Sequence, residues 1–160
     1  MRQTEILRVR KQNVPVELAL ADTAPRPVEI FLAEHQAHEF RRQHILDLLE
    51  GGPAFLPARD QTTGSWEIFN KEALLWIRVP LGPLGESEEG GSEELFDYRA
   101  PVRVELHGGA ALDGELLYSA PGEASRPVDY LNQTGRFFRL WNSEYLYLVN
   151  RSFVLRVIEL

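Results

Sequence analysis

The chain has 160 residues, no cysteine and a formal net charge of −7. Without cysteine it forms no disulfide, no zinc site with thiolate ligands and no thiol nucleophile. Its hydrophobic content of 44% is typical of a globular protein, and its length suits one domain or two small ones.

The first half of the chain contains strand-like apolar segments and one segment with helical periodicity. The strand-like segments fall at residues 14–18, 29–32, 55–56 and 74–77. Between residues 33 and 50, Phe40, Ile45 and Leu49 are among the apolar residues spaced as on one side of a helix, and Gly51 follows as a helix terminator. Residues 1–79 therefore predict a β-rich unit with an inserted helix at about 33–50.

The segment 80–98 is rich in Pro, Gly, Ser and Glu, and it contains six acidic residues and no basic one. Such a composition buries too little apolar surface to offset the entropy of ordering the chain. We therefore predict an acidic, solvated linker at 80–98. Because most of the negative charge lies there, the rest of the chain is close to neutral.

The second half, residues 99–160, predicts five short strands and one helical turn. Val102, Val104 and Leu106 alternate with polar residues, as in a half-buried strand. Ser125 is a candidate cap for a helical turn that follows the second strand, with Pro127 near its start. Five short strands joined by tight turns favour a small closed or partly open barrel.

The two halves carry similar blocks in the same order, which predicts a tandem duplication. Val14-x-Val16-Glu17-Leu18 matches Val102-x-Val104-Glu105-Leu106, so Leu18 is matched to Leu106. The spacing from Asp47 to Phe55 equals that from Asp129 to Phe137. We therefore expect a mainly β fold with one inserted helix, built as two tandem five-stranded barrels.

Three blocks of the second half carry a resemblance to known domains: Arg126-Pro127-Val128-Asp129-Tyr130-Leu131-Asn132, Phe137-Phe138-Arg139-Leu140 and Asn150-Arg151-x-x-Val154-Leu155. This half resembles a group of small uncharacterised bacterial domains, whose strand order is similar to that of Sm-like or SH3-like barrels. The resemblance covers about residues 100–160 and, more loosely, 14–79, where Glu50 stands in place of the central asparagine. It implies a small-barrel fold. The RNA-contacting signature of the Sm family is absent, so RNA binding is not carried over.

One cluster has side chains that bind metals, namely His35, His38 and Glu39. On a helix these residues share a face, and imidazole and carboxylate groups bind zinc or other divalent ions. The spacing differs from the His-Glu-x-x-His motif of metalloproteases, and the second half has no matching cluster. A metal-dependent enzyme is therefore an alternative hypothesis, while a solvated helix face is the interpretation that we favour. We predict no metal and no cofactor.

The other alternative, which ranks above the metal-dependent enzyme, is a single-stranded nucleic-acid-binding Sm-like protein. Its candidate residues are aromatic and basic side chains that stack on bases and pair with phosphates, namely Arg136, Arg139, Trp141, Tyr145 and Arg151. Strand alternation is expected to bury about half of the aromatic rings, and the near-neutral barrels do not attract a phosphate backbone over distance. A nucleic-acid partner is therefore not the favoured prediction.

Four polar residues match between the halves, Asp47 with Asp129 and Asn70 with Asn150. We predict structural roles for them. A carboxylate in a short helix accepts backbone hydrogen bonds, and asparagine tolerates positive φ in a tight turn.

No serine nucleophile elbow and no phosphate-binding glycine loop occurs in the sequence. The start of the chain lacks the unbroken apolar run of a signal peptide or a membrane span. We therefore expect a cytoplasmic, non-enzymatic module without membrane contact. Its predicted role is protein–protein interaction or assembly, through a protein partner or self-association.

Overall fold

The computed structural model describes residues 11–21, 23–34, 43–90 and 96–160. The first half consists of β1 (Lys11–Leu20), β2 (Arg26–Ala33), α2 (Ile45–Glu50), β3 (Phe55–Asp60), β4 (Trp66–Asn70), the 3₁₀ turn η1 (Lys71–Ala73) and β5 (Leu74–Pro80). The second half consists of β6 (Tyr98–Leu106), β7 (Ala111–Tyr118), the 3₁₀ turn η3 (Gly122–Ala124), α3 (Pro127–Gln133), β8 (Phe137–Trp141), β9 (Tyr145–Asn150), the 3₁₀ turn η4 (Arg151–Phe153) and β10 (Val154–Glu159).

The prediction of a mainly β chain with few helices is confirmed. In both halves, two strands precede a short helix, two more strands follow it, and a 3₁₀ turn leads into the fifth strand. The helix predicted at 33–50 is shorter in the structure. Ala33 still belongs to β2, α2 begins at Ile45, and residues 35–42 lie outside the described part of the chain.

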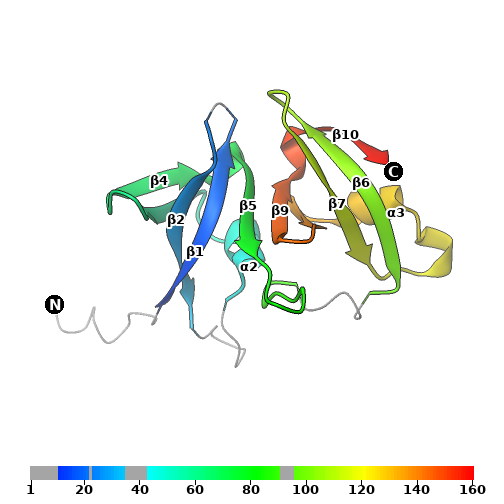
Figure 1. The fold of residues 1–160 in the computed structure, drawn as a ribbon, viewed down its shortest axis with the longest axis horizontal. Helices are drawn as coiled ribbons and strands as arrows, with labels where there is room; N and C mark the ends of the chain where they lie inside the picture. The colour runs from blue at the N-terminus through cyan, green and yellow to red at the C-terminus, as the bar shows by residue number, and fades with distance from the viewer. Residues whose placement is uncertain (1–10, 22, 35–42, 91–95) are drawn as a thin grey trace.

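The ten strands of the described residues join in one antiparallel sheet with the order β10-β6-β7-β8-β9-β5-β1-β2-β3-β4. The sheet is continuous and open, instead of being divided into two separate sheets. Within each half the strand order is the same: the fifth strand of the half pairs with the first strand, and the second, third and fourth strands follow. The halves lie side by side, with β5 and β9 between them and with β4 and β10 at the two ends of the sheet (Figure 1).

The strand register corrects the match between Leu18 and Leu106. Leu106 lies opposite Val154, the first residue after the turn η4. The residue opposite Leu74, which follows η1 in the same way, is Leu20. The structural counterpart of Leu106 is therefore Leu20. Because side chains alternate with a period of two residues, an offset of two keeps the same face of the strand, and the sequence pattern does not reveal the offset.

Buried apolar side chains form two clusters. The first core contains the buried residues of the first half together with five residues from the second half. The second core contains the buried residues of the second half together with three residues from the first half. The residues of the second half in the first core are Leu117, Phe137, Trp141, Leu146 and Leu148. The residues of the first half in the second core are Ala19, Leu75 and Trp76. Each half therefore completes the core of the other.

Part of the predicted solvated linker packs against the protein. The Glu89 side chain is buried, and its carboxylate accepts a hydrogen bond of 2.6 Å from the backbone N–H of Ile45 at the start of α2. Its backbone carbonyl accepts a bond of 3.0 Å from Nε of Arg139 on β8. Gly90 lies so close to the Trp141 ring that no side chain fits there. Residues 86–90 therefore connect α2 to β8, a role that composition did not reveal.

Candidate functional site: the junction and the open edges

The two halves are joined where β5 pairs with β9. The opposed residues are Trp76 with Val149, Ile77 with Leu148, Arg78 with Tyr147, Val79 with Leu146, and Pro80 with Tyr145. This pairing is not between strands of one half. It links the last strand of the first half to the fourth strand of the second, which makes the sheet continuous.

Side chains on both strands cross the junction. Leu146 and Leu148 of β9 are fully buried in the first core. In the opposite direction, Leu75 and Trp76 of β5 lie in the second core, where the Trp76 ring meets Tyr147 edge-on with 5.1 Å between centroids. The junction therefore excludes water on both faces of the sheet.

Two polar side chains, of the buried Asn150 and the exposed Glu50, fix the position of one half against the other. The amide nitrogen Nδ2 of Asn150 donates a 2.9 Å bond to the carbonyl of Leu74, and its Oδ1 accepts a 3.0 Å bond from the N–H of Ser152. On the other side of the junction, the Glu50 carboxylate of α2 accepts bonds of 2.7 and 3.0 Å from the N–H groups of Phe137 and Arg136.

Near the surface, Arg78 links residues of the two halves across the junction. Its guanidinium donates to the Tyr147 hydroxyl at 2.9 Å and to the Glu17 carboxylate at 2.7 Å, and it lies over the Tyr145 ring at 4.1 Å from the centroid. Burial by itself lowers the pKa of Arg78, but the bonds to Tyr147 and Glu17 raise this pKa above its ordinary value. The charged guanidinium is thus retained between the halves.

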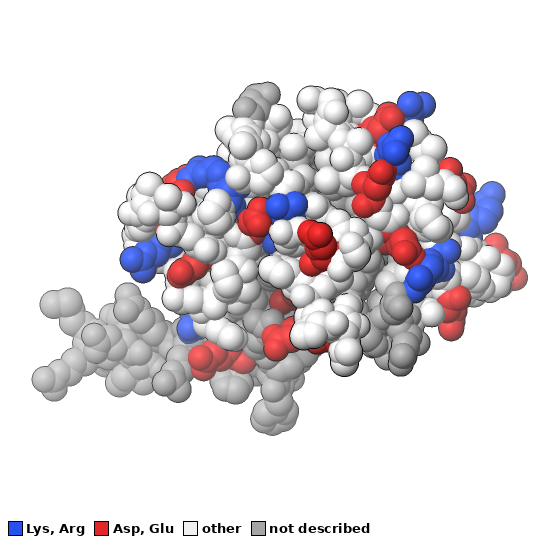
Figure 2. Space-filling view, viewed as in Figure 1, with Lys and Arg blue, Asp and Glu red and all other residues white. Residues whose placement is uncertain are grey.

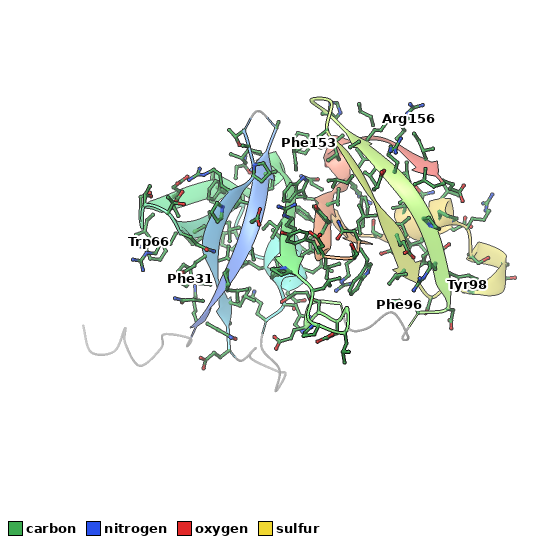
Figure 3. All side chains as sticks on the ribbon, viewed as in Figure 1. Phe31, Trp66, Phe96, Tyr98, Phe153 and Arg156 are labelled. Carbon is green, nitrogen blue, oxygen red and sulfur yellow. The ribbon has the colours of Figure 1, made fainter. Side chains whose placement is uncertain are left out.

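The two ends of the sheet have no strand partner in the described structure. On β4, Trp66 and Ile68 point away from the first core and are exposed, and Phe55 of the neighbouring strand β3 is exposed beside them. On β10, Leu155 is exposed. Figure 3 shows Trp66 near Phe31, on which it stacks with 5.1 Å between centroids, at the end of the molecule opposite to Arg156 of β10. We call Phe55, Trp66 and Ile68 the β4 patch.

Ion pairs lie beside both open edges and leave little net charge there. Arg26 forms ion pairs with Asp60 of β3 and with Glu67 of β4. Arg156 of β10 pairs with Glu105 of β6 at 2.6 Å. The hydrogen bond from Arg26 and two backbone N–H donors, of Thr63 and Thr62, lower the pKa of Asp60 to about 2. On the face shown in Figure 2, acidic and basic groups are interspersed.

The matched aspartates cap their own helices. Asp47 accepts a 2.9 Å bond from the N–H of His44, and Asp129 accepts a 3.2 Å bond from the N–H of Arg126. The Arg126 guanidinium also pairs with Asp129 and lowers its pKa. Neither aspartate is placed to act with the other, because each is committed to its own half.

The matched asparagines begin the two 3₁₀ turns. Asn70 accepts a bond from the N–H of Glu72 as Asn150 does from Ser152, both at 3.0 Å. Their φ angles are −77° and −74°, so the expectation that they use positive φ is wrong. Asn150 is fully buried at the junction, whereas Asn70 is exposed at the open edge.

The basic residue after each asparagine binds the end of the preceding helix, a role that sequence reasoning missed. Nζ of Lys71 donates to the carbonyls of Leu48 and Gly51, and Arg151 donates at 2.9 Å to the carbonyl of Thr134. A cation at a helix C-terminus satisfies its free carbonyls. Burial lowers the pKa of Lys71.

The candidate nucleic-acid residues do not form one exposed stacking surface. Trp141 is buried in the first core, and the Tyr145 ring is covered by Arg78. Arg136 pairs with Glu72 at 3.7 Å, while Arg139 binds the linker and Arg151 binds the end of α3. The expected surface thus contains no free aromatic face of Trp141 on which a base could stack.

The candidate metal ligands His35, His38 and Glu39 lie outside the described residues. Among the residues that the structure does describe, no group of three metal-ligating side chains comes together. Among the described residues, the α-helices α2 and α3 have six and seven residues, which is too short to span a bilayer.

The β4 patch was not identified as a unit from the sequence, although its signal is present. Trp66 and Ile68 alternate with Glu67, but alternation by itself does not show which face of a strand is buried.

The protein-family models, the curated proteins and the solved structures with which the chain was compared yielded no match.

Proposed function

We propose that this chain is a non-enzymatic module for protein–protein interaction or assembly, built from two tandem five-stranded small-barrel units. The observation that carries the proposal is the open sheet, whose end strands β4 and β10 have exposed apolar side chains and no strand partner among the described residues. An unpaired strand presents a row of backbone donors and acceptors to another strand.

The tandem arrangement is supported by the repeated order of elements and by the repeated strand order within each half. The barrel description is supported by the way in which each half encloses most of its own core residues. Equivalent local contacts occur in both halves, including the helix caps of Asp47 and Asp129 and the turn caps of Asn70 and Asn150.

Strand addition is the proposed mechanism of binding. A partner strand that pairs with an open edge gains main-chain hydrogen bonds, and pockets for alternate side chains give specificity. Natural proteins commonly protect open edges with proline or lysine. β4 and β10 contain neither of these two residue types.

The proposal is tested by cross-linking the full-length chain in its native cells and identifying the linked proteins by mass spectrometry. The variants are Ile68→Lys on β4, Leu155→Lys on β10 and, as a matched control, Leu84→Lys in the loop 81–90. All three replace an exposed apolar residue, but Leu84 is not on a strand.

We expect a cross-linked protein, either this chain or another, that is lost in an edge variant and kept in Leu84→Lys. If no protein is linked, or if Ile68→Lys and Leu155→Lys both keep every link, strand addition at these edges is contradicted.

A further inference from the structure

We propose that the open edge of β10 in one copy of this chain pairs with the open edge of β4 in a second copy, in the arrangement that joins β5 to β9 within the chain. This inference rests on the proposed function and names its partner. It predicts a head-to-tail assembly in which every copy offers one β4 edge and one β10 edge.

The structure supplies the equivalence on which the inference depends. β5 and β10 both follow a 3₁₀ turn that begins with a capping asparagine. β4 and β9 both end in that asparagine, which lies opposite Phe55 in the first half and Phe137 in the second. The free edge strands β10 and β4 are therefore the counterparts of β5 and β9, the two strands that already pair.

The same equivalence predicts the register between copies. Ile77 lies opposite Leu148 at the junction, and their counterparts are Val157 and Ile68. Extending this pairing sets Arg156 opposite Phe69, Ile158 opposite Glu67, and Glu159 opposite Trp66. No two like charges lie opposite each other in this register, which would otherwise be destabilising.

Equivalent residues of the junction and of the open edges differ in burial. Leu146 and Leu148 of β9 are buried at the junction, whereas Trp66 and Ile68 at the same positions of β4 are 62% and 74% exposed. Phe137 of β8 is buried in the first core, whereas its counterpart Phe55 is 59% exposed. On the other strand, Leu75 is buried in the second core and its counterpart Leu155 is 60% exposed. The apolar groups that the junction covers within the chain are those left uncovered at the two ends.

The helix and the asparagine extend the match beyond the strands. α2 covers Phe137 and binds its N–H through Glu50. The counterpart helix α3 has Asn132 at the position of Glu50 and an exposed Val128 at the position of Leu46, ready to cover Phe55 of the next copy. Asn70 caps the turn that follows it, as Asn150 does, but Asn70 is exposed. In the assembly its Nδ2 would donate to the carbonyl of Val154 of the second copy, as Nδ2 of Asn150 donates to the carbonyl of Leu74 within the chain.

A contact between unlike edges leaves a free edge at each end of an open assembly. Each added copy leaves one β4 and one β10 edge free until a ring closes, or the assembly grows as a filament. Pairing of like edges, β4 with β4 or β10 with β10, would instead stop at a dimer.

The test is the mass in solution of the purified full chain, measured by sedimentation velocity and mass photometry over a wide concentration range. The wild type and Leu84→Lys are expected to form species larger than a dimer. Ile68→Lys and Leu155→Lys, each with one edge blocked, are expected to be monomeric alone. When mixed, they are expected to form a dimer and nothing larger, because one intact β10 edge meets one intact β4 edge. Circular dichroism checks that each variant is folded.

A dimer of either single variant alone would show pairing of like edges and would overturn the inference. A wild type that stays monomeric at every concentration would also overturn it. The proposed function would survive that result if cross-linking in cells still gave a different protein whose link depends on β4 or β10.

The register is tested separately with cysteines, because the chain has none of its own. A mixture of Ile68→Cys and Val157→Cys is expected to form a disulfide-linked dimer, since directly opposed residues of antiparallel strands lie within disulfide distance. Ile158→Cys, whose side chain points to the other face, is the control and is expected to link poorly with Ile68→Cys. Equal linking in both mixtures would refute the predicted register.

Discussion

The side-chain amide of Asn150 joins the two halves of the chain by donating a 2.9 Å hydrogen bond to the backbone carbonyl of Leu74. Asn70 has the same place in its own half and the same cap on the following turn, but it is exposed at the end of the sheet. A comparison of Asn150 with Asn70 therefore separates the contribution of the turn cap to stability from the contribution of the hydrogen bond across the junction.

Asn150→Ala is expected to destabilise the monomeric protein more than Asn70→Ala does. Both variants lose a turn cap, but Asn150→Ala also leaves the Leu74 carbonyl without its buried donor. An unsatisfied buried group costs about 1–3 kcal/mol, which is the expected difference between the two free energies of unfolding. Urea unfolding in the Ile68→Lys background, where assembly is blocked, measures it. Equal destabilisation would show that the bond to Leu74 contributes nothing.

Phe137→Ala and Phe55→Ala make the same change at equivalent positions. Phe137 is buried in the first core, so its truncation is expected to cost about 3–5 kcal/mol of unfolding free energy. Phe55 is exposed in the single chain, and its truncation is expected to change the stability by no more than about 0.5 kcal/mol. Thermal unfolding of the assembly-blocked protein compares them. A large loss for Phe55→Ala would mean that Phe55 packs within the single chain.

The ion pair of Asp60 with Arg26 predicts a loss of stability in acid. The folded-state pKa of Asp60 is about 2, below the model-peptide value of about 3.9. The carboxylate therefore stabilises the fold above that unfolded-state value, and its contribution is lost as the pH falls from about 4 to 2. Asp60→Asn is expected to be less stable at neutral pH and to show a smaller fall across this window. Urea unfolding at a series of pH values measures both, and parallel curves for the two proteins would contradict the prediction.

Glu89→Ala is expected to release the segment 86–90 from α2 and β8. The variant loses the buried carboxylate that binds the N–H of Ile45 and leaves that donor unsatisfied, at a cost of about 1–3 kcal/mol. Limited proteolysis is expected to cut this segment faster than in the wild type. Leu84→Ala, which removes an exposed side chain of the same loop, serves as the control. Equal cutting in both variants would show that Glu89 does not hold the segment.

Local patterns predicted the local elements. The alternation of Val102, Val104 and Leu106 predicted a strand of the second half, and these residues lie within β6. The predicted helix at 33–50 was less successful. Ala33 is the last residue of β2 because it pairs with Lys11 of β1. Helical periodicity in a sequence does not show which segments pair with a distant strand.

Three features depended on contacts between residues far apart in the sequence. The first is the offset by two residues of Leu106 relative to Leu18, which is set by the register of β6 on β10. The second is the burial of Glu89, which follows from the position of α2. The third is the opposite exposure of Trp66 and Leu146, since both stand at the same place in the same pattern.

The sequence by itself determined that the chain is mainly β, that two similar sets of blocks follow each other, and that a segment of each of β1, β2, β3, β5 and β6 is a strand. These properties arise from side-chain alternation and turn residues, which act over a few positions. Only the tertiary structure decided that β5 pairs with β9, and therefore which apolar faces are covered and which remain open. Backbone hydrogen bonding makes any two strands able to pair, so the choice of partner comes from the packing of side chains from both halves around shared cores.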